Sequence, residues 1–268
     1  MNHIGLLAGV GRLPVDFARA ARGMGFAVTA VAVVPGVDEE LPGVVDAFYE
    51  ISAGELSKVL ELLREKQISK VTMLGKVTKE TLFNGTVRPD ARMAALLAGL
   101  KDYSDDTIMM ALVRELAAAG VETMDQTAML RLLLPEPGPL TQRVPNAEQQ
   151  ADLEFGMEMA RKIGGLDIGQ TVVVKNRAVM AVEAIEGTDA CIRRGGQLGR
   201  GSVRVAKTAK PDQDIRFDMP AVGPSTIAAM AEAGADCLAL EAGKTLLVDR
   251  EKTLELAERH GIAIIAIP

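Results

Sequence analysis

Two charged clusters in the second half of the chain hold the residue types that phosphoryl chemistry uses. The first, VEAIEGTDACIRRGG, places Glu183, Glu186 and Asp189 around a strand end and a glycine turn, beside Arg193 and Arg194. Carboxylate oxygens bind hard cations and guanidinium groups bind phosphate, so this stretch could hold a metal ion and a phosphate together. An ordinary helix cap with surface ion pairs uses the same residue types, and the sequence leaves both interpretations open.

The second cluster lies in VAKTAKPDQDIRFDMPAVGPST. Its charged residues fall within twelve positions: Lys207, Lys210, Asp212, Asp214, Arg216 and Asp218. Pro211 and Pro220 restrict the backbone around them. A single charged residue here would be interpreted as a solvated loop residue, but two such clusters in one half of the chain favour a functional site.

Metal ligands other than carboxylates are scarce in this chain. Only two histidines, His3 and His260, are present, so a three-histidine zinc site is excluded. Carboxylates without histidine or thiolate favour Mg²⁺ or a similar ion, which commonly acts with lysine and arginine on phosphate groups. The residues therefore indicate phosphoryl transfer. We interpret Cys191 and Cys237 as small buried hydrophobes and His260 as structural.

The first third of the chain offers a weaker candidate at GVGRLP. Gly9 and Gly11 follow an expected strand and precede an expected helix, where backbone amides can hold a phosphate. The third glycine of the dinucleotide fingerprint is missing, so a plain strand-to-helix turn explains the motif equally well. Lys76, at the end of another expected strand, can contact an anion or lie in solvent. Asp105 and Asp106 are expected to be helix N-cap and first-turn acids.

Strand-like and helix-like segments alternate along the first part of the chain, as in IGLLAGV, PVDFARAARGMG and FAVTAVAVV. Such continuous apolar strands predict a parallel sheet covered on both faces, in an N-terminal Rossmann-like domain of residues 1–134. The segment PEPGPLTQRVP carries four prolines and predicts a Pro-rich linker at 135–145. Residues 146–268 are then expected to form a distinct C-terminal α/β domain, so the fold class is α/β.

Composition limits the remaining classes of protein. The 268-residue chain is 48% apolar and 25% charged, which excludes global disorder. Its net charge of −6 and its lack of tryptophan argue against nucleic-acid binding. The start MNHIGLLAGVGRLPVDF has the features of neither a signal peptide nor a membrane span, so we expect a cytoplasmic protein without a nucleic-acid partner.

Seven segments in order resemble one known family: GLLAGVGRLP, LGKV, DD before a helix, LDIGQTVVV, VEAIEGTDA, KPDQDIRFDMPAVGPST and LEAGKTLLVD. The set runs from the first expected strand to near the end of the chain. It is similar to the LpxI type of UDP-2,3-diacylglucosamine pyrophosphatase. The conjunction of EGTDA with KPDQDIRFD is far more specific than the glycine turn alone.

The resemblance implies an enzyme of lipid A, and hence lipopolysaccharide, biosynthesis. Such an enzyme hydrolyses the pyrophosphate bond of UDP-2,3-diacylglucosamine, a lipid-linked UDP-sugar, to UMP and 2,3-diacylglucosamine 1-phosphate. The resemblance also implies Mg²⁺ or another divalent cation such as Mn²⁺, a homodimer, and peripheral contact with the inner membrane. The alternative hypotheses are a Rossmann-type NAD(P) oxidoreductase and a non-catalytic binding module for a nucleotide-sugar lipid.

The same resemblance implies roles for individual residues. Carboxylates hold the metal or orient the attacking water, and lysine and arginine cations neutralise the charge of the pyrophosphate. The implied catalytic residues are Asp218, Asp214, Lys207, Lys210 and Arg216. The implied metal ligands are Asp218, Asp214, Glu186 and Asp189. The implied substrate-binding residues are Gly9, Gly11, Lys76, Gly187, Thr188, Arg193 and Gln213.

Overall fold

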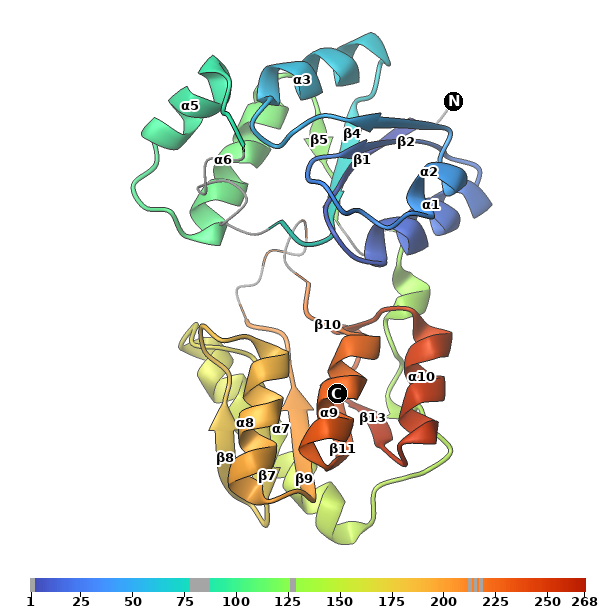
Figure 1. Cartoon of the computed structure of the whole chain (residues 1–268), viewed down its shortest axis with the longest axis vertical. Helices are drawn as coiled ribbons and strands as arrows, with labels where there is room; N and C mark the ends of the chain where they lie inside the picture. The colour runs from blue at the N-terminus through green and yellow to red at the C-terminus, as the bar shows by residue number, and fades with distance from the viewer. Residues whose placement is uncertain (1–2, 78–86, 126–128, 212–213, 215, 217–218) are drawn as a thin grey trace. The chain divides into compact units, whose positions relative to one another are not determined.

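The structure is a computed structural model that describes residues 3–77, 87–125, 129–211, 214, 216 and 219–268; of Asp105, Asp106 and Leu132 it describes the backbone only. The chain folds as two compact units. The first comprises Met1–Leu130 with Ile215–Phe217, and the second comprises Arg131–Asp214 with Asp218–Pro268. Each unit has its own sheet and its own helices (Figure 1).

The first unit contains a five-stranded sheet in the order β3-β2-β1-β4-β5, and every ladder in it is parallel. The strands are β1 His3–Ala8, β2 Ala27–Ala32, β3 Ala47–Glu50, β4 Lys70–Leu74 and β5 Glu122–Thr123. The strands β1, β2 and β4 are buried along most of their length, as expected where helices cover both faces of a sheet. The prediction of a parallel sheet is confirmed.

Helices pack around this sheet: α1 Leu13–Gly23, α2 Leu41–Val44, α3 Leu56–Glu65, α5 Ala91–Ala98 and α6 Asp105–Ala118. Helix α3 buries a stripe of leucine and valine at helical spacing. The N-cap of α6 is Ser104, whose hydroxyl accepts from the Thr107 amide at 3.3 Å. The expected N-cap role of Asp105 or Asp106 is therefore wrong, because the helix starts one residue earlier and both acids fall inside its first turn.

The second unit contains a six-stranded mixed sheet in the order β6-β13-β11-β9-β7-β8. Its strands are β6 Gly138–Pro139, β7 Thr171–Lys175, β8 Ala178–Val182, β9 Val203–Lys207, β11 Ala235–Glu241 and β13 Ala263–Ile267. The strands β9, β11 and β13 are parallel, whereas β7 pairs antiparallel with both β8 and β9, and β6 pairs antiparallel with β13. A separate parallel pair is formed by β10 Ala221–Val222 and β12 Leu246–Leu247.

Helices cover both faces of the six-stranded sheet: α7 Ala147–Gly165, α8 Thr188–Gly199, α9 Pro224–Ala233 and α10 Arg250–Arg259. Leu153 and Met157 of α7 form a buried cluster with Ala206 on one face. Val173 points to the other face, where α8 and α9 pack. Glycine allows α8 to approach the sheet closely, because a Cβ on Gly195 would lie 2.6 Å from the Val173 side chain.

The segment predicted as a Pro-rich linker, residues 135–145, joins the edge of the second sheet through β6. The Leu140 amide then donates to the Ile264 carbonyl at 2.8 Å, and the buried Thr141 hydroxyl accepts from the Ile264 amide at 2.8 Å. Proline has no N–H to donate and is tolerated on an edge strand. The loop-like composition therefore concealed a short strand.

Candidate functional site

The carboxyl ends of β9 and β11 bring several polar residues together in the second unit. Lys207 is the last residue of β9, and Glu241 is the last residue of β11. Lys207 lies opposite Leu240 on one side and opposite Thr171, the first residue of β7, on the other. Glu183 follows β8, whose end pairs with the start of β7. Open α/β sheets bind ligands at this edge, so the arrangement is a candidate active site.

A chain of hydrogen bonds joins Lys207 to Glu183 through Thr188. The Lys207 ammonium donates to the Thr188 hydroxyl (Nζ to Oγ1, 2.8 Å), and that hydroxyl donates to Glu183 (Oγ1 to Oε1, 2.8 Å). Lys207 is 4% exposed and Glu183 is 7% exposed. Buried charges are tolerated where hydrogen bonds and an opposite charge compensate them, and this chain supplies both. The sequence pointed to the three residues separately but gave no sign that they are joined.

Thr188 is also the first residue of helix α8. The N-cap before it is Gly187, which has a φ of 80° and no side chain to occupy the free amides of the first turn. Those amides carry the positive end of the helix dipole. With the Lys207 ammonium beside Thr188, this turn offers a positively polarised place for a phosphate. The expected substrate-binding residues Gly187 and Thr188 thus lie next to the expected catalytic Lys207.

Glu241 forms a second buried network, which the sequence analysis missed. Its Oε2 accepts from the Thr208 hydroxyl and from the Ala209 amide (3.0 Å), and its Oε1 accepts from the Lys244 ammonium (2.9 Å). Burial raises the pKa of this carboxyl, but the hydrogen bonds from Thr208, Lys244 and Ala209 outweigh burial, and the pKa is lowered. Glu241 therefore fixes the start of the loop that follows β9. The available signal was an apolar strand, CLAL, that ends in a glutamate.

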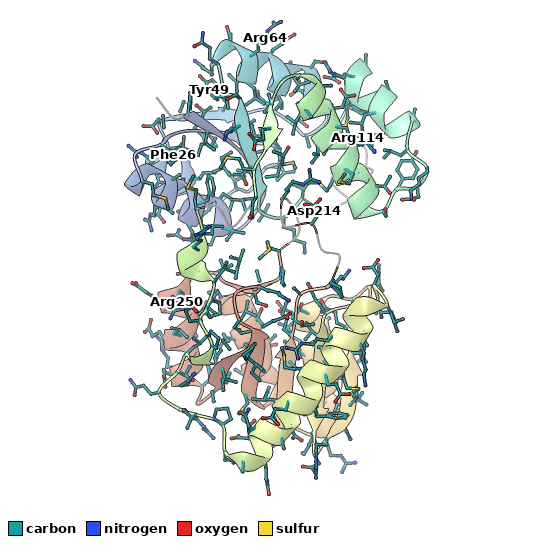
Figure 2. The ribbon with its side chains drawn as sticks, turned by 180° about the vertical axis from the view of Figure 1, so that it is seen from behind. Phe26, Tyr49, Arg64, Arg114, Asp214 and Arg250 are labelled. Carbon is teal, nitrogen blue, oxygen red and sulfur yellow. The ribbon has the colours of Figure 1, made fainter. Side chains whose placement is uncertain are left out.

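The loop after β9 carries further expected catalytic residues. Lys210 donates to Asp167 (Nζ to Oδ1, 2.6 Å) in a pair that is open to solvent on the aspartate side. Asp214 lies on this loop as well (Figure 2). Asp218 and Gln213, expected as a catalytic residue and a substrate-binding residue, lie outside the described residues.

Arg216 groups with the first unit, although it follows Asp214 closely in sequence. Its Nη2 lies 3.3 Å from the Met110 sulfur on α6. Methionine sulfur is a weak acceptor, so this contact orients the guanidinium without neutralising its charge. The expected role of Arg216 toward phosphate stays a prediction.

The acids near the α8 turn interact locally. Glu186 forms an ion pair with Arg194, and this hydrogen bond lowers the pKa of Glu186. Asp189 lies in the first turn of α8, where a carboxylate complements the helix dipole. Within the ranges that the structure describes, no group of three His, Cys, Asp or Glu side chains could hold a metal ion. The expected ligands Asp214, Glu186 and Asp189 are therefore not assembled there, and Asp218 lies outside those ranges.

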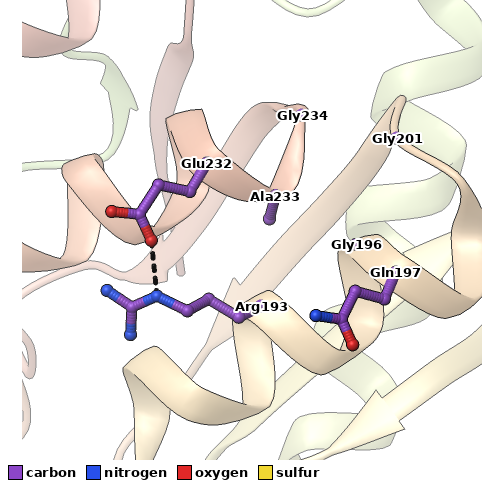
Figure 3. A pocket seen from close by; sticks show the side chains of 7 residues that line it. All are labelled: Arg193, Gly196, Gln197, Gly201, Glu232, Ala233 and Gly234. Carbon is purple, nitrogen blue, oxygen red and sulfur yellow. Dashed lines mark hydrogen bonds and ion pairs between the residues drawn. The ribbon is translucent and has the colours of Figure 1, made fainter.

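A pocket of about 420 Å³ lies between α8 and α9 (Figure 3). Its lining residues are Arg193, Gly196, Gln197, Gly201, Glu232, Ala233 and Gly234. Arg193 donates to Glu232 at 2.5 Å. Gly201 and Gly234 precede β9 and β11, so the pocket lies at the amino ends of these strands. Arg193, expected to bind substrate, therefore lies away from Lys207, which ends β9.

In the first unit, the carboxyl ends of β1 and β4 meet at glycine residues. A Cβ on Gly9 would lie 2.7 Å from the Lys76 carbonyl oxygen, and one on Gly75 would lie 2.6 Å from the Gly9 oxygen. Val10 and Lys76 exchange backbone hydrogen bonds of 3.0 and 2.7 Å beside this approach. Gly11 has a φ of 116°, which favours glycine. The expected residues Gly9 and Lys76 are thus brought together by their backbones, with Gly11 two residues on.

Arg12 at the start of α1 pairs with acids that the sequence analysis did not connect to it. Its guanidinium contacts Glu40 and, at 3.4 Å, Asp38, both in the segment that follows β2. Burial lowers the pKa of Arg12, but these hydrogen bonds outweigh burial and raise the pKa. The acids come after VVPG, the apolar segment that follows β2, so inspection of the expected strand end alone missed them.

The two cysteines and the two histidines lie in structural positions. Cys191 and Cys237 are buried, and burial raises the pKa of both thiols to about 12. The nucleophilic thiolate is therefore suppressed, and the interpretation of both as small buried hydrophobes is confirmed. His3 shares a hydrogen bond of 2.8 Å with Thr29, and His260 is the C-cap residue of α10.

Comparisons with known proteins match nearly the whole chain to one family. Residues 3–133 match the model of the LpxI N-terminal domain, and residues 136–265 match the model of the LpxI C-terminal domain. The chain is also 34% identical over 279 residues to the UDP-2,3-diacylglucosamine pyrophosphatase LpxI of Caulobacter vibrioides. That match covers 100% of this chain and 98% of the Caulobacter protein.

Solved structures give weaker likenesses. Glycinamide-RNase-transformylase T from Mycobacterium tuberculosis matches at a TM-score of 0.28 and 15% identity, over 51% of this chain and 37% of that protein. A UDP-glucose-4-epimerase from Stenotrophomonas maltophila matches at a TM-score of 0.30 and 16% identity, over 45% of this chain and 34% of that protein. Scores this low carry no functional weight. The two domain models and the full-length relative show that the chain belongs to the LpxI family.

Proposed function

We propose that this chain hydrolyses the pyrophosphate bond of UDP-2,3-diacylglucosamine and releases UMP and 2,3-diacylglucosamine 1-phosphate, a step of lipid A biosynthesis. The full-length match to the Caulobacter vibrioides pyrophosphatase carries this proposal. The motif EGTDA, which leads into α8, and the motif KPDQDIRFD, which follows β9 in sequence, agree with it, because Thr188 of the first motif accepts a hydrogen bond from Lys207, the last residue of β9.

The reaction forms one P–O bond and breaks another. The oxygen of a water molecule bonds to one phosphorus, the bond from that phosphorus to the bridging oxygen breaks, and the bridging oxygen leaves on the other phosphate. One proton of the water passes to a base, and the other stays with the phosphate product or passes to solvent. The protein has little covalent chemistry to perform, so positioning and charge stabilisation dominate catalysis.

Lys207 and the start of α8 supply that stabilisation in the part of the site that the structure describes. The Lys207 ammonium lies 2.8 Å from the Thr188 hydroxyl, at the first turn of the helix. A cation and free helix amides stabilise the negative charge that develops on the pyrophosphate oxygens. Lys210 and Arg216 act on the same charge in this proposal.

Asp214 and Asp218 are the proposed base or water-orienting carboxylates, with Glu186 and Asp189 completing the acidic site. Their oxygens are of the type that Mg²⁺ prefers, and we propose Mg²⁺, or Mn²⁺ in its place, as the cofactor. A bound divalent cation supplies neutralisation of the pyrophosphate charge. The carboxylates that the structure describes do not assemble three ligands by themselves, so the proposal of a cation depends on the donor chemistry of the wider set.

Nucleotide binding is the proposed role of the first unit. Its strand order, β3-β2-β1-β4-β5, follows the first five strands of the Rossmann-like dinucleotide-binding fold. In that fold the ligand lies at the carboxyl ends of the first and fourth strands, where Gly9 and Lys76 meet here. Gly9, Gly11 and Lys76 are the residues assigned to this contact.

The acyl chains of the substrate need apolar surface, and α5 offers some. Ala94, Ala95 and Ala98 of this helix are exposed, and Leu96 and Leu97 are half-buried. We propose peripheral contact with the inner membrane by a cytoplasmic homodimer, to be tested by vesicle co-sedimentation and by light scattering. Among the helices that the structure describes, none is long and apolar enough to cross a membrane.

Incubation with substrate tests the proposed activity. The protein is mixed with UDP-2,3-diacylglucosamine and Mg²⁺, UMP release is followed, and a parallel sample contains EDTA. We expect UMP with Mg²⁺ and none with EDTA. A folded protein that releases no UMP with any divalent ion contradicts the proposal. Affinity for a nicotinamide dinucleotide would then indicate the oxidoreductase alternative, and binding of the UDP-sugar lipid without release would indicate a binding module.

A further inference from the structure

Glu183 is a buried carboxylate outside the residues assigned to substrate. Its Oε1 accepts from the Thr188 hydroxyl at 2.8 Å, and its Oε2 accepts from the Gln170 amide at 3.3 Å. The Glu183 amide donates to the Thr171 carbonyl at 2.9 Å. A Cβ on Gly169 would lie only 2.1 Å from the Glu183 carbonyl oxygen, so the two backbones are in close contact. The carboxylate is therefore a fixed point beside the β7–β8 hairpin.

The Thr188 hydroxyl carries one proton, and its neighbours decide where that proton points. A lysine ammonium only donates, and an ionised carboxylate only accepts. Thr188 Oγ1 therefore accepts from Lys207 and gives its proton to Glu183, while the Thr171 hydroxyl is more distant at 3.5 Å. The Thr188 hydroxyl has no second proton for a phosphate, so the expected substrate contact of Thr188 falls to its backbone amide.

We propose that Glu183 is a positioning residue, which holds the Lys207 ammonium in place through Thr188 for its action on the pyrophosphate. This inference rests on the proposed hydrolase function. Lysine has a flexible stem, and fixing its ammonium before the substrate binds removes an ordering step from the reaction. Glu183 also places a negative charge in the hydrogen-bond chain of a lysine that is 4% exposed, which helps to compensate its burial.

Substitutions at Thr188 separate the hydroxyl from the shape of the side chain. Valine keeps the volume but accepts no hydrogen bond, whereas serine keeps the hydroxyl. We expect Thr188→Val to lower kcat for UMP release about 30-fold or more, with a smaller change in KM, and Thr188→Ser to recover most of that loss. A Thr188→Val variant with the kcat of the parent would overturn the proposal.

Glu183→Gln removes the negative charge and keeps the size of the side chain. This variant also tests the proposal if Thr188→Val does not fold. We expect kcat to fall about 10-fold. The matched control is Glu255→Gln, which removes a carboxylate from an exposed pair with Arg259 on α10. This control should leave kcat unchanged, and equal losses in the two glutamine variants would contradict a specific role for Glu183.

A double-mutant cycle tests whether the effect passes through Lys207. In a Lys207→Met background, Thr188→Val should lower kcat by no more than about 3-fold, and fully additive losses would overturn the proposal. Crystal structures of the parent and of Thr188→Val give a readout that needs no turnover. We expect Lys207 Nζ to move by about 1 Å or more, and an unmoved Nζ overturns the proposal whatever the assay shows. A parent that releases no UMP overturns the proposed function instead.

Discussion

The two units differ in what lies at the carboxyl edges of their sheets: buried charged side chains in one and close glycine backbones in the other. In the second unit, the edge holds Lys207, Glu183 and Glu241, which are 4–7% exposed and lie in networks of hydrogen bonds. In the first unit, the edge is made by the touching backbones of Gly9 and Gly75, with an exposed Lys76 beside them.

This difference separates two tasks. A buried, compensated charge keeps its geometry and acts through a low dielectric, which suits the stabilisation of charge that develops during a reaction. Close backbones without side chains suit the approach of a ligand to amide groups. We therefore propose that turnover takes place at the carboxyl edge of the second unit's sheet, the second edge, and that the nucleotide is recognised at that of the first unit's sheet, the first edge. Substitutions at each edge can break that division.

The largest effect is expected at Asp218, the last carboxylate of KPDQDIRFD and the proposed base or metal ligand. Asp218→Ala should lower kcat about 1000-fold or more, because it removes the acid that we propose to orient water or to hold a cation. Circular dichroism should show a folded protein. The control Asp212→Ala, in the same stretch of sequence, should stay close to the parent. Near-normal UMP release by Asp218→Ala would remove this residue from the mechanism.

Glu241→Gln should loosen the start of the loop that follows β9, and we expect kcat to fall about 10-fold. Its effect on stability depends on pH. The folded-state pKa of Glu241 is lowered, so ionised Glu241 stabilises the fold above its unfolded pKa of about 4.3, and this stabilisation is lost as the pH falls through the folded pKa.

Urea unfolding of the parent and of Glu241→Gln measures that dependence. The difference in unfolding free energy between them should be largest near pH 7 and should shrink below about pH 4. A difference that is the same at both pH values would show that the charge of Glu241 contributes nothing.

Gly75→Ala disturbs the first edge alone. Its Cβ would lie 2.6 Å from the Gly9 oxygen, so we expect KM for the substrate to rise several-fold with a smaller change in kcat. Gly120→Ala is the matched control, because Gly120 also has a positive φ, 80°, but no atom within 4 Å of an added Cβ. Both variants should lose about 1 kcal/mol of stability from backbone strain, and Gly75→Ala should lose more, because the backbone at Gly9 must shift to admit its Cβ. A KM that changes equally in both would argue against nucleotide recognition at the first edge.

The sequence predicted the parts of the second edge but not their connections. The cluster of charges after an expected strand pointed to Lys207, whereas only the resemblance to the LpxI family pointed to Thr188. Their contact depends on the pairing of Thr171 with Lys207 across β7 and β9, which no local pattern encodes. Glu241 was missed for the same reason, because its partners Thr208 and Ala209 are more than thirty residues away in sequence.

The alternation of strands and helices predicted the first sheet well, because parallel strands covered on both faces are apolar along their length. The edge strand β6 was hidden by its prolines, and the mixed direction of the second sheet depends on pairing rather than on composition. The expected grouping of acids stays a prediction, because Asp218 lies outside the described residues and, among the described acids, Glu186 pairs with Arg194.

The most direct test compares Lys207→Met with Lys76→Met, one lysine from each edge. Methionine keeps an unbranched side chain and removes the charge, and circular dichroism shows whether each variant is folded. The division of tasks predicts that Lys207→Met lowers kcat for UMP release about 100-fold with little change in KM. It predicts that Lys76→Met raises KM several-fold and keeps kcat within about 2-fold of the parent. Equal losses of kcat in the two variants, or a loss confined to Lys76→Met, would contradict it.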